Sequence, residues 1–140
     1  MLILDTDHIS EIERNTKFEV QLIARLDQAG TPVAITIVSV DEQMRGLLKL
    51  VRRARQPDER VRAYGRLQSY VEDLTAWTIR PWVDSAEHEL ARLQAARLGV
   101  STMDLRIASI TLANNATLLS RNLRDFTKIP GLRVEDWLQQ

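Results

Sequence analysis

A short apolar run at the start of the chain ends abruptly in acidic residues, and this feature most constrains the fold. Residues 2–4 are apolar at successive positions rather than at alternate ones. That pattern is typical of a strand buried on both faces of a parallel sheet. Asp5 then lies at the carboxyl end of the strand, and in open α/β sheets this edge binds ligands where the strand order reverses. The run therefore predicts an α/β fold with Asp5 at a candidate ligand site.

The acids after this run also have a purely structural interpretation. An Asp that follows a strand commonly caps the next helix or makes a turn. We expect Asp7 to act in this way and to open a helix that begins near Ile9. Taken alone, Asp5 fits a structural role and a functional role equally well, so acids elsewhere in the chain must decide between them.

Length and composition limit the class of protein. A chain of 140 residues predicts a single domain over residues 1–140, with a core that needs no disulfide. There is no cysteine, no basic leader and no apolar run as long as a membrane span, so we expect a soluble, cytoplasmic protein without membrane contact. Because 19 Lys and Arg balance 19 Asp and Glu, any contact with a polyanion must be local.

Apolar periodicity and helix breakers divide the rest of the chain into alternating strands and helices. Gly30 and Gly99 end two of the helices, and Pro57 interrupts the helical pattern between them. Pro81 cannot donate to a ladder, which places the third strand near a sheet edge. The alternation predicts a three-layer α/β/α domain with a central, mostly parallel sheet of about five strands. The expected strands span residues 2–4, 33–38, 77–82, 116–120 and 132–134, and the expected helices span residues 9–29 with a break at Asn15 and a cap at Thr16, then 40–55, 58–74, 85–98 and 102–114.

Two further acids follow the pattern of Asp5. Glu42 comes just after the second strand, and Asp104 lies in the first turn of a helix. In a right-handed parallel α/β fold, strand ends and the starts of the following helices share one edge. For each acid alone the sequence favours a capping box, formed with Ser39 or with Ser101. The coincidence of three acids at one edge instead favours a cation, since close carboxylates otherwise raise one another's pKa.

An oxygen-only set of this kind suits Mg²⁺ or Mn²⁺. Zinc is disfavoured because His8 and His88 are isolated, and we expect His8 to be a solvated surface residue. A bound divalent ion lowers the pKa of its water and offsets charge on a phosphate, which favours phosphodiester hydrolysis. The segment after the fourth strand supplies candidates for a fourth site group, namely Ser120, Asn122 and Asp125.

These segments together resemble the PIN-domain ribonucleases and, within them, the VapC toxins of type II toxin/antitoxin pairs. The resemblance implies a PIN-like domain and a metal-dependent endoribonuclease whose acids are Asp5, Glu42 and Asp104, with Ser120 or its neighbours ordering the site. It also implies an RNA substrate, for which tRNA is a candidate, a short and largely disordered cognate antitoxin that blocks the cleft, and toxin homodimers. The resemblance rests on residues 2–7, 39–42, Gly46, 104–108, 118–126 and 129–132.

One departure from the family concerns the position soon after the fourth strand. The family often has an acid there, whereas this chain has Asn122, with Asp125 three residues later. An amide can bind a metal ion or a metal-bound water but brings no charge, so the number of metal ions, one or two, stays open.

The helical hairpin in the middle of the chain has a basic side and an apolar side. Arg52, Arg53 and Arg60 are candidates for contact with an RNA backbone, and a solvated helix face is the alternative for each of them. Apolar residues exceed what a single core-facing stripe needs, so part of this helix is a candidate docking surface for an antitoxin helix or a second subunit, although core packing is favoured for each residue alone. These residues are Leu47, Leu48, Leu50 and Val51, and we assign Trp77, Trp82 and Trp137 to packing.

Two other functions stay open at this point. An apolar strand followed by Asp5 and Asp7 also resembles the start of haloacid-dehalogenase-like phosphatases. Those enzymes need a late lysine and a late acidic pair, but Lys128 is the only late lysine and Asp125 has no adjacent acid. The other alternative is a non-catalytic domain that binds RNA or protein, which requires that the acids point apart.

Overall fold

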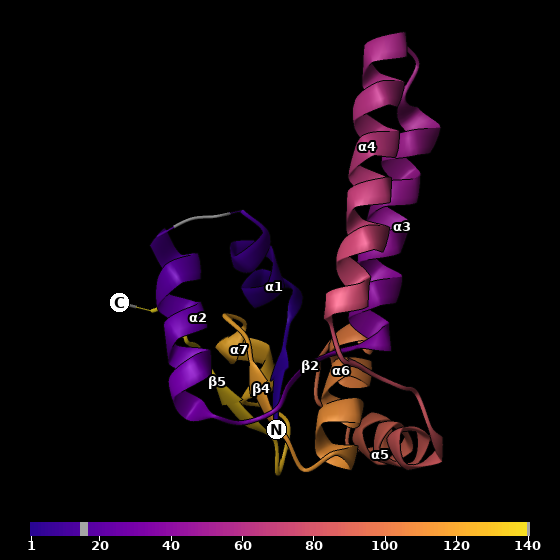
Figure 1. Ribbon diagram of the computed structural model, residues 1–140. Helices are drawn as coiled ribbons and strands as arrows, with labels where there is room; N and C mark the ends of the chain where they lie inside the picture. Colours follow the sequence, from indigo (N-terminus) through magenta and orange to yellow (C-terminus); the bar gives the residue numbers. More distant parts are fainter. Residues whose placement is uncertain (15–16, 140) are drawn as a thin grey trace.

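The computed structural model describes residues 1–14 and 17–139, and Figure 1 shows their arrangement. The predicted helix break at Asn15 and cap at Thr16 lie outside these residues. The described residues form one sheet of five strands in the order β3-β2-β1-β4-β5, and every neighbouring pair is parallel. The predicted parallel sheet is thus confirmed. The strands are β1 (Leu2–Leu4), β2 (Val33–Thr36), β3 (Ile79–Arg80), β4 (Thr117–Leu119) and β5 (Arg133–Glu135).

Two hydrophobic cores lie on opposite faces of this sheet, which explains why β1 is apolar at every position. Ile3 packs in a core with Leu118 and with the helices α5 (Asp84–Ala95) and α6 (Thr102–Ala113). Leu4 packs in the other core with residues of α1 (Thr6–Glu13) and α2 (Lys17–Ala29). Figure 1 shows these two pairs of helices on either side of the strands. The predicted three-layer α/β/α architecture is confirmed.

A long helical hairpin extends from the body of the molecule (Figure 1). It consists of α3 (Ile37–Arg53) and α4 (Pro57–Asp73), and we call it the α3–α4 arm. Pro57 occupies the first turn of α4, where its missing N–H costs nothing. A short 3-10 helix, η1 (Leu74–Ala76), leads from the arm into the edge strand β3, and α7 (Leu123–Phe126) follows β4.

Two helices begin earlier than the sequence predicted, because different residues cap them. Asp5, and not Asp7, caps α1, and its carboxylate accepts from Thr6 N at 2.8 Å. Thr36 Oγ1 accepts from Ser39 N at 3.0 Å, so α3 begins at Ile37 and the predicted capping box of Ser39 is wrong. The strand predicted over residues 33–38 therefore ends at Thr36. The four-residue helix α7 was not expected either, because it is too short to show a period.

The apolar segments of these helices are short or one-sided. No helix in the described part of the chain is both long enough and apolar enough to cross a membrane.

Candidate metal centre at the ends of β1 and β4

The strand order reverses at β1, and the two segments that leave the sheet there meet through their side chains. β2 lies on one side of β1 and β4 on the other, so the switch point is the crevice beyond β1 and β4. Asp5 follows β1, Ser120 follows β4, and Ser120 Oγ donates to Asp5 Oδ2 at 2.8 Å. Both side chains are buried. The structure thus places Asp5 at the ligand-binding edge that its position after an apolar run predicted.

Asp7 joins this site, although the sequence suggested only a helix cap. Its Oδ2 accepts from Arg121 N at 2.9 Å and lies 3.3 Å from Ser120 Oγ. Its Oδ1 lies 2.6 Å from His8 Nδ1. The signal for this role was present in the sequence: once Asp5 is recognised as the cap, Asp7 belongs to the first turn of α1 and lies at the same edge of the sheet.

Asp104 is placed by a cap and held by an amide. Ser101 Oγ accepts from Asp104 N at 3.2 Å, which confirms Ser101 as the cap of α6. The carboxylate of Asp104 points elsewhere, because its Oδ2 accepts from Asn122 Nδ2 at 3.3 Å. Asn122 Nδ2 also lies 3.2 Å from Asp125 Oδ2. The segment after β4 is therefore joined to Asp5 through Ser120 and to Asp104 through Asn122.

Glu42 completes the acidic set from the arm. Because α3 begins at Ile37, Glu42 lies in the second turn rather than in the first. Its Oε1 is buried and has no hydrogen-bond partner among the described residues. Burial raises the pKa of Glu42, and the charges of Asp5 and Asp104 raise it further. A buried carboxylate oxygen without a donor is costly unless a cation compensates it.

The acids raise one another's pKa across the site. Burial, followed by the charge of Asp7 and with a smaller contribution from Asp104, raises the pKa of Asp5 to about 6, although Ser120 and Thr6 donate to it. Burial also raises the pKa of Asp104, together with the charges of Asp125 and Asp7. Asp7 behaves differently: burial opposes its ionisation, but the hydrogen bonds from His8 and Arg121 outweigh that effect, and its pKa lies below the ordinary value.

The carboxylate and amide oxygens of this site suit a divalent ion that keeps most of its waters, rather than one bound entirely by protein ligands. Within residues 1–14 and 17–139, no group of three or more histidine, aspartate or glutamate side chains is arranged so that it could hold a metal ion by itself. Mg²⁺ does not need one, because it keeps several waters and takes one or two carboxylates together with substrate phosphate. The unpaired oxygen of Glu42 and the raised pKa of Asp5 are the two observations that favour such an ion.

His8 is not the solvated residue that we expected. It is fully buried, with an exposed fraction of 0%. The earlier start of α1 turns His8 toward the C-terminal segment, where its Nε2 accepts from Trp137 N at 3.1 Å. Among the tryptophans assigned to packing, Trp77 and Trp137 pack against the core beside α1, and Trp82 packs against the other core.

The candidate RNA-binding arginines lie apart from the acids. Arg52 and Arg53 occupy the last turn of α3, and Arg60 lies in α4 just after the turn of the arm. All three are exposed. Since a helix rises 1.5 Å per residue, Arg52 is about 15 Å along the axis from Glu42. These arginines can contact only a substrate that extends along the arm.

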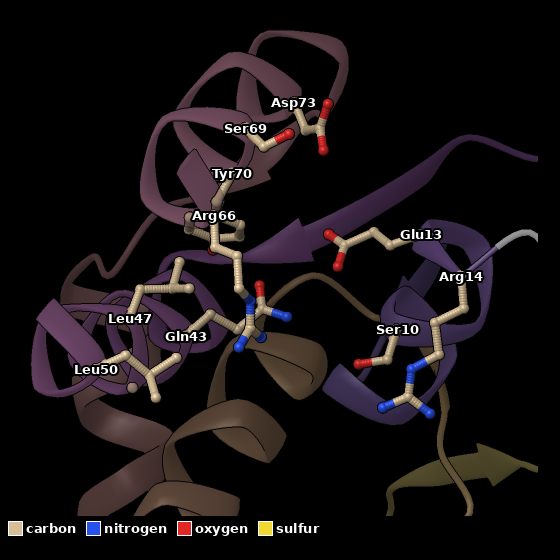
Figure 2. A pocket seen from close by; sticks show the side chains of 11 residues that line it. Ser10, Glu13, Arg14, Gln43, Leu47, Leu50, Arg66, Ser69, Tyr70 and Asp73 are labelled. Carbon is tan, nitrogen blue, oxygen red and sulfur yellow. The ribbon is translucent and has the colours of Figure 1, made fainter. Parts of the chain in front are cut away.

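A groove of about 480 Å³ separates α1 from the arm, and Figure 2 shows its side chains. Leu47 and Leu50, from the predicted docking surface, line the arm side of this groove. Leu48 and Leu50 are both exposed. Burial, together with Glu13, raises the pKa of Tyr70 to about 12. The hydroxyl of Tyr70 and Oε1 of Gln43 are buried in the free chain without a hydrogen-bond partner in the described structure. The groove is lined by Ser10, Glu13, Arg14, Gln43, Gly46, Leu47, Leu50, Arg66, Ser69, Tyr70 and Asp73.

The fold and the site together define a class of protein. A doubly wound parallel sheet with acids at its switch point is an α/β domain built to bind a ligand outside the carboxyl ends of β1 and β4. The acids and amides at that edge are hard oxygen ligands, and no cysteine occurs in the chain. The class is therefore an α/β domain with a candidate site for a divalent cation.

Comparison with known proteins narrows this class. No family model matches the chain. Over 45 residues, 32% of the chain, the sequence is 42% identical to Ribonuclease VapC2 of Rickettsia felis, and the match covers 34% of that protein. The fold is similar to a structure of VapBC2 from Rickettsia felis bound to a DNA fragment from its promoter, with a TM-score of 0.75 and 21% identity over 97% of this chain and 98% of the other. DNA-bound VapBC from Salmonella typhimurium is similar with a TM-score of 0.73 and 22% identity over 97% of each chain.

These findings confirm the predicted resemblance to VapC-like PIN-domain toxins. The sequence similarity extends over a minor part of the relative, whereas the similarity of fold extends over nearly the whole chain.

Proposed function

We propose that this protein is a metal-dependent endoribonuclease and the toxin of a toxin/antitoxin pair. The observation that carries the proposal is the meeting of Asp5 and Ser120 at the switch point, with Asp104 and Glu42 in the same electrostatic environment. The local similarity to Ribonuclease VapC2 and the fold shared with VapBC structures support it. The substrate class is RNA, and tRNA is the first candidate to test.

The residues divide into those that would hold a metal ion and those that orient them. From the set Asp5, Asp104 and Glu42, one or two carboxylates would bind Mg²⁺ or Mn²⁺ directly and the rest through its waters. The bound ion would lower the pKa of a water and offset charge on a phosphodiester. Ser120 donates to Asp5 and keeps its Oδ2 at the site. Asn122 holds Asp104 on one side and Asp125 on the other. Asn122, which stands where the family often has an acid, would thus orient a ligand.

The groove between α1 and the arm supports a partner. Leu47 and Leu50 give it an apolar wall, and polar residues that include Arg66 and Ser69 line it as well. A helix of a cognate antitoxin would cover both kinds of surface, because amphipathic helices bind grooves through an apolar face. A toxin homodimer is the second assembly that we propose.

Cleavage of mixed RNA by the pure protein, with Mg²⁺ or Mn²⁺ and with EDTA, tests the activity. We expect Asp104→Asn to lower the rate by at least about 100-fold, since a lost metal ligand removes several kcal/mol of transition-state stabilisation. Asp84→Asn is the matched control, because Asp84 also lies in the first turn of a helix. If the parent binds RNA but never cleaves it, a non-catalytic RNA-binding domain replaces this proposal, and if Asp104→Asn cuts as well as the parent, the role of Asp104 is wrong.

A further inference from the structure

A buried histidine connects the C-terminal segment to the acidic site. His8 lies in the first turn of α1 and is fully buried. On one side its Nδ1 lies 2.6 Å from Asp7 Oδ1. On the other side its Nε2 lies 3.1 Å from the backbone nitrogen of Trp137, which is 129 residues away in the sequence. Nothing in the proposed chemistry uses this ring, so its burial between two polar partners needs a reason.

The partners of His8 define which ring nitrogen carries the proton. A backbone N–H can only donate, so Nε2 must offer its lone pair to Trp137 N. The proton of a neutral ring is then on Nδ1, where it is donated to Asp7 Oδ1. Asp136 Oδ1 is also nearby, 3.8 Å from Nε2, and it accepts from Leu138 N at 2.9 Å. The C-terminal segment thus sets the tautomer of His8, and the tautomer provides a donor to Asp7.

Asp7 connects His8 to the acidic site through the contacts of its second carboxylate oxygen. Its second oxygen accepts from Arg121 N at 2.9 Å and lies 3.3 Å from Ser120 Oγ, which in turn donates to Asp5. The C-terminal segment also contacts the far side of Ser120, since Ser120 N donates to Glu135 O at 2.9 Å. Because the single proton of the Ser120 hydroxyl is donated to Asp5, Asp7 is joined to this segment by its hydrogen bond from Arg121 N, the residue next to Ser120. The hydrogen bonds therefore lead from Trp137 through His8 and Asp7 to the backbone at Arg121, and from Ser120 to Asp5.

We propose that His8 is a positioning residue: held by Trp137 N in its Nδ1–H tautomer, it fixes Asp7, which holds the backbone at Arg121 and so positions the adjacent Ser120, whose hydroxyl orients Asp5 for a divalent cation. This inference rests on the proposed function, because it assigns His8 to the same site. Partners that orient metal ligands in this way typically contribute 10–100-fold to metal affinity.

Two isosteres separate the two hydrogen bonds of the ring. In His8→Asn the amide stands where Nδ1 was and still donates to Asp7, but the acceptor for Trp137 N is lost. In His8→Gln the amide reaches the position of Nε2 and still accepts from Trp137 N, but the donor to Asp7 is lost. Each variant loses one buried hydrogen bond, so we expect similar decreases in melting temperature. His88→Asn, at an exposed position of α5, is the matched control.

The test measures Mn²⁺ affinity by calorimetry, the ¹⁵N shifts of the His8 ring by NMR and RNA cleavage. We expect a protonated Nδ1 and a bare Nε2 in the parent, Mn²⁺ affinity close to that of the parent in His8→Asn, and an affinity about 10–100-fold lower in His8→Gln. Equal losses of affinity in both variants, or a parent ring protonated on Nε2, overturn the proposal.

The outcomes also separate this inference from the proposed function. A difference between the two variants in Mn²⁺ affinity, with no RNA cleavage by the parent, supports the role of His8 and contradicts the nuclease. Cleavage by the parent without a difference between the variants contradicts the role of His8 alone. If the parent takes up no Mn²⁺, the inference about His8 is wrong. RNA cleavage by the parent then shows whether the proposed nuclease function is wrong as well.

Discussion

Asp5 is a residue whose ionisation depends strongly on its surroundings. It is buried at the end of β1, next to Asp7 and within reach of the charge of Asp104, and its pKa is raised to about 6. Asp7, two residues further along the chain, has a lowered pKa because it accepts hydrogen bonds from His8 and Arg121. Two neighbouring aspartates therefore affect stability in opposite directions.

Asp5→Asn is expected to stabilise the metal-free protein at neutral pH. With a pKa near 6 in the folded chain and an ordinary value of 3.8, Asp5 stabilises the fold fully only below about pH 3.8, and this contribution is lost as the pH rises through 6. Removing the charge should raise the free energy of unfolding by about 1–3 kcal/mol at pH 7.5 and by nearly nothing at pH 4.

Urea unfolding in EDTA at both pH values measures this effect. Asp7→Asn serves as the control of opposite sign: its lowered pKa stabilises the fold above its unfolded value, so this variant should be less stable at pH 7.5. Equal stability of the Asp5→Asn variant and the parent at pH 7.5 would show that Asp5 is not under electrostatic strain.

Ser120→Ala should weaken metal binding in a pH-dependent manner. The hydroxyl of Ser120 lowers the pKa of Asp5, so its removal raises that pKa further and protons compete better with the cation. We expect Mn²⁺ affinity to fall by about 10-fold at pH 6 and by less at pH 8. The control is Ser109→Ala, which removes a buried hydroxyl bonded within α6 to Leu105 O. A loss that is independent of pH would point to a structural role for Ser120.

At the scale of elements, the position at which a helix begins decides which side chains enter the site. Because Asp5 caps α1, that helix begins at Thr6 and places Asp7 and His8 in its first turn. Because Thr36 caps α3, Glu42 lies in the second turn. Its carboxylate is still close enough for the charges of Asp5 and Asp104 to raise its pKa. A shift of one residue rotates a side chain by about 100° around a helix, so these caps determine the composition of the site.

The arm offers a second prediction at this scale. If RNA extends along the arm, the triple variant Arg52→Gln, Arg53→Gln and Arg60→Gln should raise KM and leave kcat nearly unchanged, because these side chains lie far from the acids. The slope of log affinity against log salt should decrease by about 2 for three lost phosphate contacts on a single strand. Arg92→Gln on α5, where Arg92 pairs with Glu89, is the control. An unchanged salt slope would identify the basic side of the arm as a solvated helix face.

At the scale of the whole molecule, the proposed metal site would couple metal binding to folding. A cation that binds only the folded chain stabilises it by about 2.7 kcal/mol at a concentration of 100 Kd. Because protons compete for Asp5, whose pKa is about 6, the rise in melting temperature with Mn²⁺ should be larger at pH 8 than at pH 5.5. EDTA should reverse the rise, and Asp104→Asn should reduce it at both pH values. A rise that is the same at pH 5.5 and at pH 8 would place the cation away from Asp5.

The sheet and the three-layer architecture could be predicted from the sequence because their signals are local. Apolar runs such as residues 2–4, the breakers Gly30 and Pro57, and the edge strand marked by Pro81 each act over a few neighbouring residues. The placement of Asp5 at a strand end follows from the same signals, as does that of Asp104 after its cap. The caps of α1 and α3 were assigned incorrectly, because several polar residues near each helix start have similar preferences.

The contacts between distant segments were decided only by the tertiary structure. Asp7 meets Ser120 and Arg121 across more than a hundred residues, and His8 meets Trp137 at the other end of the chain. Such contacts depend on the strand order and on which residue begins each helix, and neither quantity is encoded in a local pattern. The sequence by itself predicted Asp5, Glu42 and Asp104 at the edge of the sheet. The tertiary structure added Asp7 to this set, because the packing of β4 between β1 and β5 brings Asp7 to Ser120 and Arg121 and holds the buried His8 between Asp7 and the backbone of Trp137.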